Sequence, residues 1–201
     1  MNSNAIGSIS NVRIIENFIP DDVLKKWQQY AEEAEYSRGT FASHADSSFL
    51  CKLDEYSKKI EELASYIFGV PLNGYDGNGS LNKWSVGDSL VLHIDAPTEF
   101  EQFVGKSEEY PPSPILYSSI IYLNNNYQGG DIYFTRHNML ISPPAGSLLL
   151  FPSNSMYPHE VREITFGNRY TFTLFLSNPN IINMFSRLFS IVEQIHNDKV
   201  D

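Results

Sequence analysis

Residues 169–176 read Arg-Tyr-Thr-Phe-Thr-Leu-Phe-Leu, and this stretch decides the fold class. Its even-numbered side chains are all apolar: Tyr170, Phe172, Leu174 and Leu176. Because successive side chains of a β-strand point to opposite faces, we predict a strand over 170–176 with one face packed on an apolar layer. The other face begins with Arg169, Thr171 and Thr173, which is unusual for a central strand.

Short strands separated by turn residues continue outward from this stretch through the second half of the chain. The candidates are residues 81–84, 89–94, 116–123, 131–134, 147–151 and 159–164, with a further strand expected within 11–19. Such a series predicts a β-barrel or a two-sheet sandwich.

Helices are expected on both sides of this β-rich region. Residues 20–22 (Pro-Asp-Asp) offer a helix start, with acidic side chains at the positive end of the helix dipole, and this helix should reach about residue 35. Apolar residues recur near helical spacing over 49–68, which predicts a second helix. The glycine-rich residues 69–79 form a loop, and 180–199 read as a final amphipathic helix.

Two longer stretches follow neither pattern. Residues 37–48 are polar and contain His44, whereas residues 96–114 are acidic and contain four prolines. Long loops inside compact domains are commonly lids or binding loops, so we expect 96–114 to close over a substrate.

Composition narrows the class of protein. The chain has 201 residues, 42% of them hydrophobic and 19% charged, as in ordinary globular proteins. Its formal net charge of −10 argues against binding to duplex nucleic acid, which requires a basic surface. Cys51 is the only cysteine, so no intrachain disulfide is possible. Without a signal-peptide pattern or an apolar run of about 18 residues, a cytoplasmic protein with no membrane segment is expected.

His93, Asp95 and His159 form the most informative set of polar residues. Two imidazoles and one carboxylate can occupy one face of iron(II) and leave the opposite positions open for a co-substrate and O₂. On the predicted strand 89–94, alternation would project His93 and Asp95 to the same side. Alone, however, His-x-Asp recurs by chance, and Asp95 could simply orient His93 through a hydrogen bond.

Arg169 strengthens the metal-site interpretation. A buried arginine without an anionic partner is costly, and a bound carboxylate would remove that cost through charge-assisted hydrogen bonds. An ion pair with a glutamate at a sheet edge explains this segment equally well. When Arg169 is considered together with His159, ten residues upstream, its role as the anchor of a carboxylate co-substrate is favoured. His137 is a weaker candidate for a metal ligand, because the residue ten positions after it is Ser147 and not a cation. We expect His44 and His196 to face solvent.

Several motifs occur together between residues 84 and 177. They are Trp84-x-x-Gly87, His93-Ile94-Asp95, Ile121-Tyr122-Leu123-Asn124, Gly129-Gly130-Asp131, Gly146-Ser147, Phe151-Pro152-Ser153, His159-Glu160-Val161 and Gly167-Asn168-Arg169-Tyr170. In order and spacing this segment resembles the catalytic domain of the prolyl 4-hydroxylase-like iron(II)- and 2-oxoglutarate-dependent dioxygenases.

The resemblance implies a mainly β fold with flanking α-helices: a double-stranded β-helix (jelly-roll) core supported by N-terminal helices and a C-terminal helix. It implies that His93, Asp95 and His159 bind iron. It further implies that Arg169 and Tyr122 hold the distal carboxylate of 2-oxoglutarate, with Thr173 lining the co-substrate pocket.

Three positions depart from the family pattern. Leu90 stands where the family often has an aromatic residue, Phe175 where a tryptophan is common, and Asp131 where a glutamate is usual. None of them removes a ligand, but Leu90 and Phe175 change the pocket wall and leave the substrate open.

The expected function is hydroxylation of a C–H bond, with peptidyl proline as the leading substrate and succinate and CO₂ as co-products. The cofactors are Fe(II), 2-oxoglutarate and O₂, with L-ascorbate as an optional addition. The alternatives are the same chemistry on a free amino acid, a small metabolite or an alkylated nucleobase, or a jelly-roll binding or sensor module without turnover. We expect a peptide or protein partner, and a monomer or homodimer.

The expected domain organisation is one domain over 1–201. Residues 1–80 would supply the N-terminal strand and supporting helices, 81–178 the catalytic core, and 179–201 the C-terminal helix.

Overall fold

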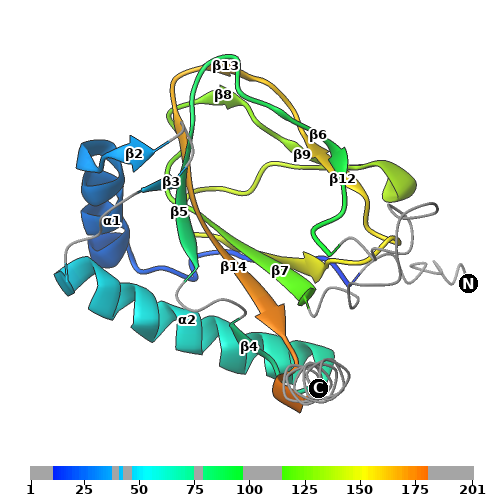
Figure 1. Cartoon of the computed structure of the whole chain (residues 1–201). Coiled ribbons are helices and arrows are strands. Elements are labelled where there is room, and N and C mark those ends of the chain that lie inside the picture. Colours follow the sequence, from blue (N-terminus) through cyan, green and yellow to red (C-terminus); the bar gives the residue numbers. More distant parts are fainter. Residues whose placement is uncertain (1–10, 38–40, 43–46, 75–78, 97–114, 181–201) are drawn as a thin grey trace, which may run out of the picture.

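Two antiparallel sheets face each other across the interior of the molecule, and two helices cover the outside of the larger one (Figure 1). The computed structural model describes residues 11–37, 41–42, 47–74, 79–96 and 115–180. The expected final helix over 180–199 and nearly all of the expected lid over 96–114 therefore lie outside the described residues.

The larger sheet has eight strands and forms one wall of the interior. Their order is β1 (Arg13–Ile15), β11 (Leu148–Pro152), β7 (Ile115–Tyr122), β14 (Arg169–Ser177), β5 (Ser80–Trp84), β3 (Phe41–Ala42) and β2 (Tyr36–Ser37), and β4 (Asn73–Gly74) also pairs with β14. The central strand β14 is hydrogen-bonded on both sides, by β7 and β5.

The smaller sheet closes the other side of the interior. It has the order β10 (Met139–Ile141), β9 (Ile132–Phe134), β12 (His159–Val161) and β6 (Leu90–His93), and a separate pair is formed by β8 (Gln128–Gly129) and β13 (Ile164–Phe166). Between β5 and β14 the chain passes repeatedly from one sheet to the other, as it does in a jelly roll. The predicted mainly β fold with a double-stranded β-helix core is confirmed.

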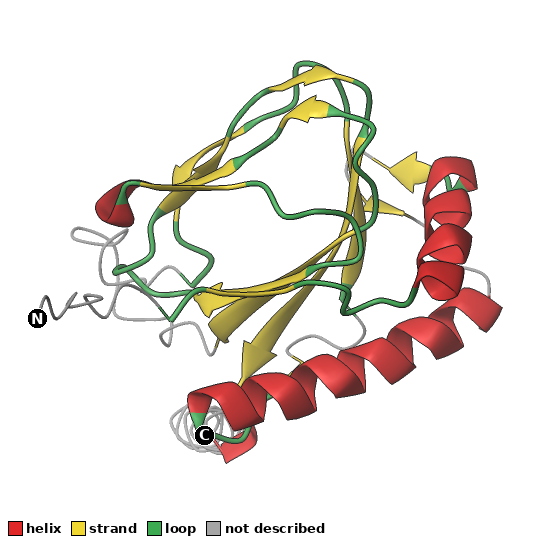
Figure 2. Cartoon of the chain, turned by 180° about the vertical axis from the view of Figure 1, so that it is seen from behind, coloured by secondary structure: helices red, strands yellow, loops and turns green. Residues whose placement is uncertain are grey.

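Helices α1 (Asp21–Glu33) and α2 (Ser47–Phe68) lie against the outer face of the larger sheet (Figure 2). Asp21 and Asp22 occupy the first turn of α1, where negative charge favours the helix dipole. Trp27 of α1 is 1% exposed and packs edge-on against Tyr56 of α2 and Phe172 of β14. Both predicted helices are therefore confirmed, and neither they nor any other helix in the described part of the chain could span a membrane.

Strand β14 carries its side chains as the alternation predicts. Tyr170, Phe172, Leu174 and Leu176 belong to the hydrophobic core beneath the helices. Arg169, Thr171, Thr173 and Phe175 point to the other side and line a cavity between the sheets. The polar face of this strand is thus the floor of an internal site.

Several boundaries differ from the prediction because tertiary hydrogen bonds interrupt the local pattern. The polar stretch 37–48 contributes to a short hairpin, β2–β3, that extends the larger sheet. The predicted strand 159–164 is two strands, β12 and β13, which pair with different partners, β9 and β8. Strand β6 ends at His93, so Asp95 lies beyond it.

Candidate functional site

A cavity of about 370 Å³ lies between the two sheets and opens to solvent. Polar side chains of β5 and β14 face it from the larger sheet. The lining residues are Ser80, Asn82, Trp84, Ser89, Leu90, His93, Asp95, Ile120, Ile132, His159, Val161, Arg169, Thr171, Thr173 and Phe175. Two groups of polar residues within it differ in chemistry. One is a set of three side chains that could hold a metal ion, and the other is a buried cation beside donors that have no partner among the described residues.

The two histidines of the first group come from neighbouring strands of the smaller sheet. His93 ends β6 and His159 begins β12, and the two residues are directly opposite in the ladder. Their ring centroids are 4.3 Å apart. His159 is 3% exposed and packs between the rings of Phe134 and Phe151, which shield it from water.

Both imidazoles are held by backbone carbonyls. His93 Nδ1 lies 2.8 Å from the Val91 carbonyl oxygen, and His159 Nδ1 lies 3.1 Å from that of Tyr157. Because a carbonyl can only accept, each Nδ1 carries the proton and donates it, which leaves the Nε2 lone pair of the neutral ring free. A hydrogen bond at the non-ligating nitrogen is the usual way in which proteins orient a metal-binding histidine.

Asp95 completes the group. Its Oδ1 lies 3.3 Å from His93 Nε2 and its Oδ2 lies 3.7 Å from His159 Nε2. One potential ligand atom from each of the three residues lies within 4.8 Å of the other two. Two imidazoles and one carboxylate that converge in this way could hold one metal ion, and this ligand set is typical of non-heme iron(II). Strand alternation does not produce the arrangement, however, since Asp95 follows the end of β6.

The three side chains of this group have different proton affinities. Burial lowers the pKa of His159, which keeps this ring neutral. Burial alone would also lower the pKa of His93, but hydrogen bonds to Asp95 and the Val91 carbonyl outweigh it, and the pKa is raised. Burial would raise the pKa of Asp95, but hydrogen bonds and charge from the two histidines and Ser118 hold it below its usual value.

These shifts predict how metal uptake depends on pH. A ligating histidine must be deprotonated, so protons compete with the metal. Because the pKa of His93 is raised above 6.5, we expect Mn²⁺ affinity to fall by up to about tenfold per pH unit once the pH drops below that raised pKa. Calorimetric Mn²⁺ titrations between about pH 5 and 8 would measure this. An affinity that is constant down to pH 5 would contradict it.

Arg169 lies at the other end of the cavity. Its side chain is almost completely buried, its guanidinium lies 4.6 Å above the Trp84 ring, and its Nη1 donates to the Gly130 carbonyl oxygen. Burial lowers the pKa of Arg169, but a guanidinium stays protonated in proteins. Among the described residues no carboxylate forms an ion pair with it. A buried cation without a counter-charge is costly, and a bound anion would offset that cost.

Three buried donor atoms at this end have no hydrogen-bond partner within the described part of the protein. They are Arg169 Nε, Trp84 Nε1 and Tyr122 Oη. Burial raises the pKa of Tyr122, so its phenol stays protonated and can donate. Unsatisfied buried donors are rare, and several beside one buried cation are the complement of a carboxylate.

The glycine pair at 129–130 makes room for this end of the cavity. Gly130 has φ +71°, and a Cβ there would meet the Ile164 side chain at 2.4 Å and Arg169 Cδ at 3.3 Å. Any larger residue would therefore be strained and would push against Arg169. The Gly129-Gly130 motif has a packing role as well as a turn role.

Thr173 lines the cavity wall between the two groups. It lies on the same face of β14 as Arg169, and its Oγ1 accepts a hydrogen bond from Asn82 Nδ2 at 3.0 Å. Sequence reasoning missed Asn82, as well as the stacking of Trp84 on Arg169 that follows from their direct pairing across β5 and β14.

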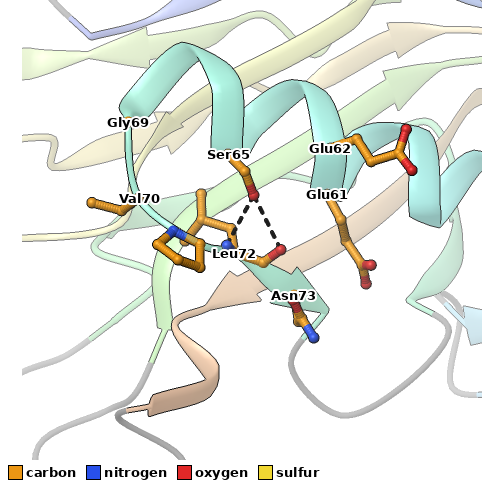
Figure 3. A pocket seen from close by; sticks show the side chains of 8 residues that line it. Glu61, Glu62, Ser65, Gly69, Val70, Leu72 and Asn73 are labelled. Carbon is orange, nitrogen blue, oxygen red and sulfur yellow. Dashed lines mark hydrogen bonds between the residues drawn. The ribbon is translucent and has the colours of Figure 1, made fainter.

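Other candidates have structural roles or lie elsewhere. His137 is outside the triad; its Nε2 lies 2.9 Å from the Met156 carbonyl and its ring packs on Tyr157. His44 and His196 lie outside the described residues. A second hollow, at the C-terminal end of α2, is shown in Figure 3. There Ser65 Oγ bonds the Leu72 backbone, and Glu61 accepts the Gly74 amide, so these groups stabilise the loop rather than form a site.

Residues 79–177 match the family profile of the 2OG-Fe(II) oxygenase superfamily, and they include both ends of the cavity. The chain belongs to this superfamily. In sequence its oxygenase domain is similar to human prolyl 3-hydroxylase 3, with 40% identity over 63 residues, which are 29% of this chain and 9% of that protein. The matched segment therefore spans about a tenth of the length of this curated relative.

Solved structures share the fold of the oxygenase domain. The viral collagen prolyl hydroxylase of Paramecium Bursaria Chlorella virus-1, solved with 2OG, aligns with a TM-score of 0.62 at 12% identity, over 83% of this chain and 95% of that one. A prolyl hydroxylase from Trichoplax adhaerens, in complex with a hypoxia inducible factor oxygen degradation domain peptide fragment, aligns with a TM-score of 0.60 at 19% identity, over 86% of each chain. At these identities the likeness concerns the fold.

Proposed function

We propose that this protein is an Fe(II)- and 2-oxoglutarate-dependent dioxygenase that hydroxylates a C–H bond of a peptidyl proline. The observation that carries the proposal is one cavity with two matched ends: three side chains that could hold a metal ion at one end, and at the other a buried Arg169 that has no ion-pair partner among the described residues. The superfamily membership and the names of the relatives support the same chemistry.

In this proposal each residue has a defined role. His93, Asp95 and His159 would hold iron(II), while Arg169 and Tyr122 would bind the distal carboxylate of 2-oxoglutarate. When bound, the iron supplies the oxidising chemistry in which 2-oxoglutarate and O₂ yield succinate, CO₂ and a hydroxylated substrate. Phe134 and Phe151 keep water away from His159.

The cavity wall supports a co-substrate that spans its two ends. Along β14, Thr173 follows Arg169 by four residues and lies on the same face of the strand. Thr173, tied to Asn82, lies on the wall between the anchor and the metal ligands and would contact the co-substrate there. Leu90 and Phe175, which also line the cavity, would form the wall that meets the substrate.

A peptidyl prolyl substrate is supported by what the relatives are named for. They include a human prolyl 3-hydroxylase and a prolyl hydroxylase solved with a peptide. The net charge of −10 disfavours duplex nucleic acid or an alkylated nucleobase as the substrate. The remaining parts of the proposal are a cytoplasmic protein without a membrane segment, a monomer or homodimer, one domain over 1–201, and stimulation by L-ascorbate.

Turnover with a peptide substrate tests the proposed function. The purified protein with Fe(II), 2-oxoglutarate and air should form succinate, and proline-containing peptides should gain 16 Da. Hydrolysis and chromatography against 3- and 4-hydroxyproline standards would identify the oxidised carbon, and free L-proline in a parallel reaction would separate peptide from metabolite substrates. A protein that binds neither Fe(II) nor 2-oxoglutarate, and that forms no succinate with any substrate, would contradict the enzyme assignment.

A further inference from the structure

Asp95 needs support that its strand does not provide. Strand β6 ends at His93, and Asp95 lies in the bend that follows. Its carboxylate is nevertheless largely buried and faces two imidazoles. A ligand outside a strand must be oriented by its own contacts if it is to keep one geometry.

A pair of buried serines supplies such contacts. Ser118 of β7 donates from Oγ to Asp95 Oδ2 at 2.5 Å, and Ser153 Oγ lies 2.7 Å from Ser118 Oγ. The two serines are 0% and 1% exposed. Since an ionised carboxylate can only accept, the single hydroxyl proton of Ser118 goes to Asp95. Ser153 must therefore donate to Ser118, and a chain of this kind strengthens each of its hydrogen bonds.

Backbone hydrogen bonds lock the same three segments together. The Ala96 amide donates to the Ser153 carbonyl at 3.0 Å, and the Ser153 amide donates to the Leu116 carbonyl at 3.0 Å. Ser153 directly follows β11, which pairs with β7, so the larger sheet holds both hydroxyls. The bend that carries Asp95 is thus fixed to this sheet by side-chain and backbone bonds at one point.

We propose that Ser118, supported by Ser153, is a positioning residue that limits Asp95 to a single metal-ligating oxygen. The inference rests on the proposed iron site. Because Oδ2 accepts the serine hydroxyl, Oδ1 is the oxygen left without a serine partner. A carboxylate that used both oxygens would occupy a further coordination position, and the site must keep positions open for its co-substrates.

Metal binding by serine variants tests the proposal without any need for turnover. We expect Ser118→Ala to weaken Mn²⁺ binding by about 10- to 100-fold, the range typical of residues that orient a metal ligand. The visible spectrum of the Co²⁺-loaded protein, which reports coordination number, should change as well. Ser118→Thr keeps the hydroxyl and should restore both, whereas Ser153→Ala should have a smaller effect of the same kind.

Ser119→Ala is the matched control. Ser119 is the next residue of β7 and equally buried, but its hydroxyl donates to the Leu174 carbonyl at 2.7 Å on the other side of the strand. Ser119→Ala should lower the free energy of unfolding of the metal-free protein about as much as Ser118→Ala does. Its Mn²⁺ affinity and Co²⁺ spectrum should stay as in the wild type. Because Ser118 and Ser153 are hydrogen-bonded to each other, the losses of Mn²⁺ affinity caused by Ser118→Ala and Ser153→Ala should be less than additive in the double variant.

The outcomes separate this inference from the function on which it rests. If the wild-type protein binds neither Mn²⁺ nor Fe(II), the proposed function fails, and the inference falls with it. If the wild type binds metal but Ser118→Ala has the same affinity and the same Co²⁺ spectrum, only the inference is overturned. An equal loss of Mn²⁺ affinity in Ser119→Ala would overturn the inference too, because general destabilisation of the protein would then explain the effect.

Discussion

Replacement of His159 by alanine should abolish the visible charge-transfer band that forms when Fe(II) and 2-oxoglutarate are added to the protein without O₂. The change removes one of three ligands, so iron affinity should fall by more than the about 10- to 100-fold that loss of a merely orienting group causes. Succinate formation in air should disappear with it. The measurements are the absorption spectrum under anaerobic conditions and 2-oxoglutarate consumption.

His159 is also part of a packed core, so the variant needs controls for folding. It contacts Phe134 and Phe151, and alanine leaves a cavity between them. His159→Gln fills more of that space and should lose the band as completely. His137→Ala removes a histidine that lies outside the triad, and should keep the band. A normal band in His159→Gln would remove this residue from the ligand set.

The two-faced character of β14 could be predicted because alternation is a local property of the chain. Each side chain from Arg169 to Leu176 lies on the side that the period of two assigns to it. Helix α2 could be predicted equally well, because the apolar residues at helical spacing over 49–68 leave little ambiguity. The short hairpin β2–β3 was not, since two-residue strands are defined by their partners rather than by their own sequence.

The site shows the same division between local and distant information. The residue types of the triad and of Arg169 could be recognised one by one, but alternation within β6 does not explain how Asp95 reaches the histidines. The support comes from Ser118, 23 residues away, which is in turn bonded to Ser153 a further 35 residues on. Serine is common in strands and loops, so nothing in the local sequence distinguishes these two from others. Only the paired strands β7 and β11 bring them to Asp95.

The two ends of the cavity depend on each other through the larger sheet. Phe175 pairs with Ser118, which bonds Asp95, and Thr171 pairs with Tyr122, which lies beside Arg169. The register of β14 against β7 therefore sets the spacing between metal ligands and anion anchor. A slip of β14 by one residue would turn Arg169, Thr171 and Phe175 to the helix face and would remove the anion anchor from the cavity.

Arg169→Ala should strongly weaken 2-oxoglutarate binding while Mn²⁺ or Fe(II) binding stays close to that of the wild type. Loss of one partner of a buried, hydrogen-bonded charge pair costs about 2–5 kcal/mol, which is a loss of affinity of about 30-fold to several thousandfold. Iron should be spared because Arg169 lies at the opposite end of the cavity from the triad and contacts Gly130, Trp84 and Tyr122 instead. Titration of the Mn²⁺-loaded protein with 2-oxoglutarate measures both quantities.

Two further variants decide whether the effect comes from the shape of the cation, from its charge or from the fold. Arg169→Lys keeps a charge but loses the planar fork, so it should recover only part of the affinity. Arg162→Ala removes an exposed arginine that lies near Glu160 at 3.8 Å, and should bind 2-oxoglutarate normally. Unchanged 2-oxoglutarate affinity in Arg169→Ala would refute the anchor. In that case the donors of Trp84 and Tyr122, which have no partner among the described residues, would have to hold the co-substrate without a cation, although a carboxylate buried without a counter-charge is strongly disfavoured.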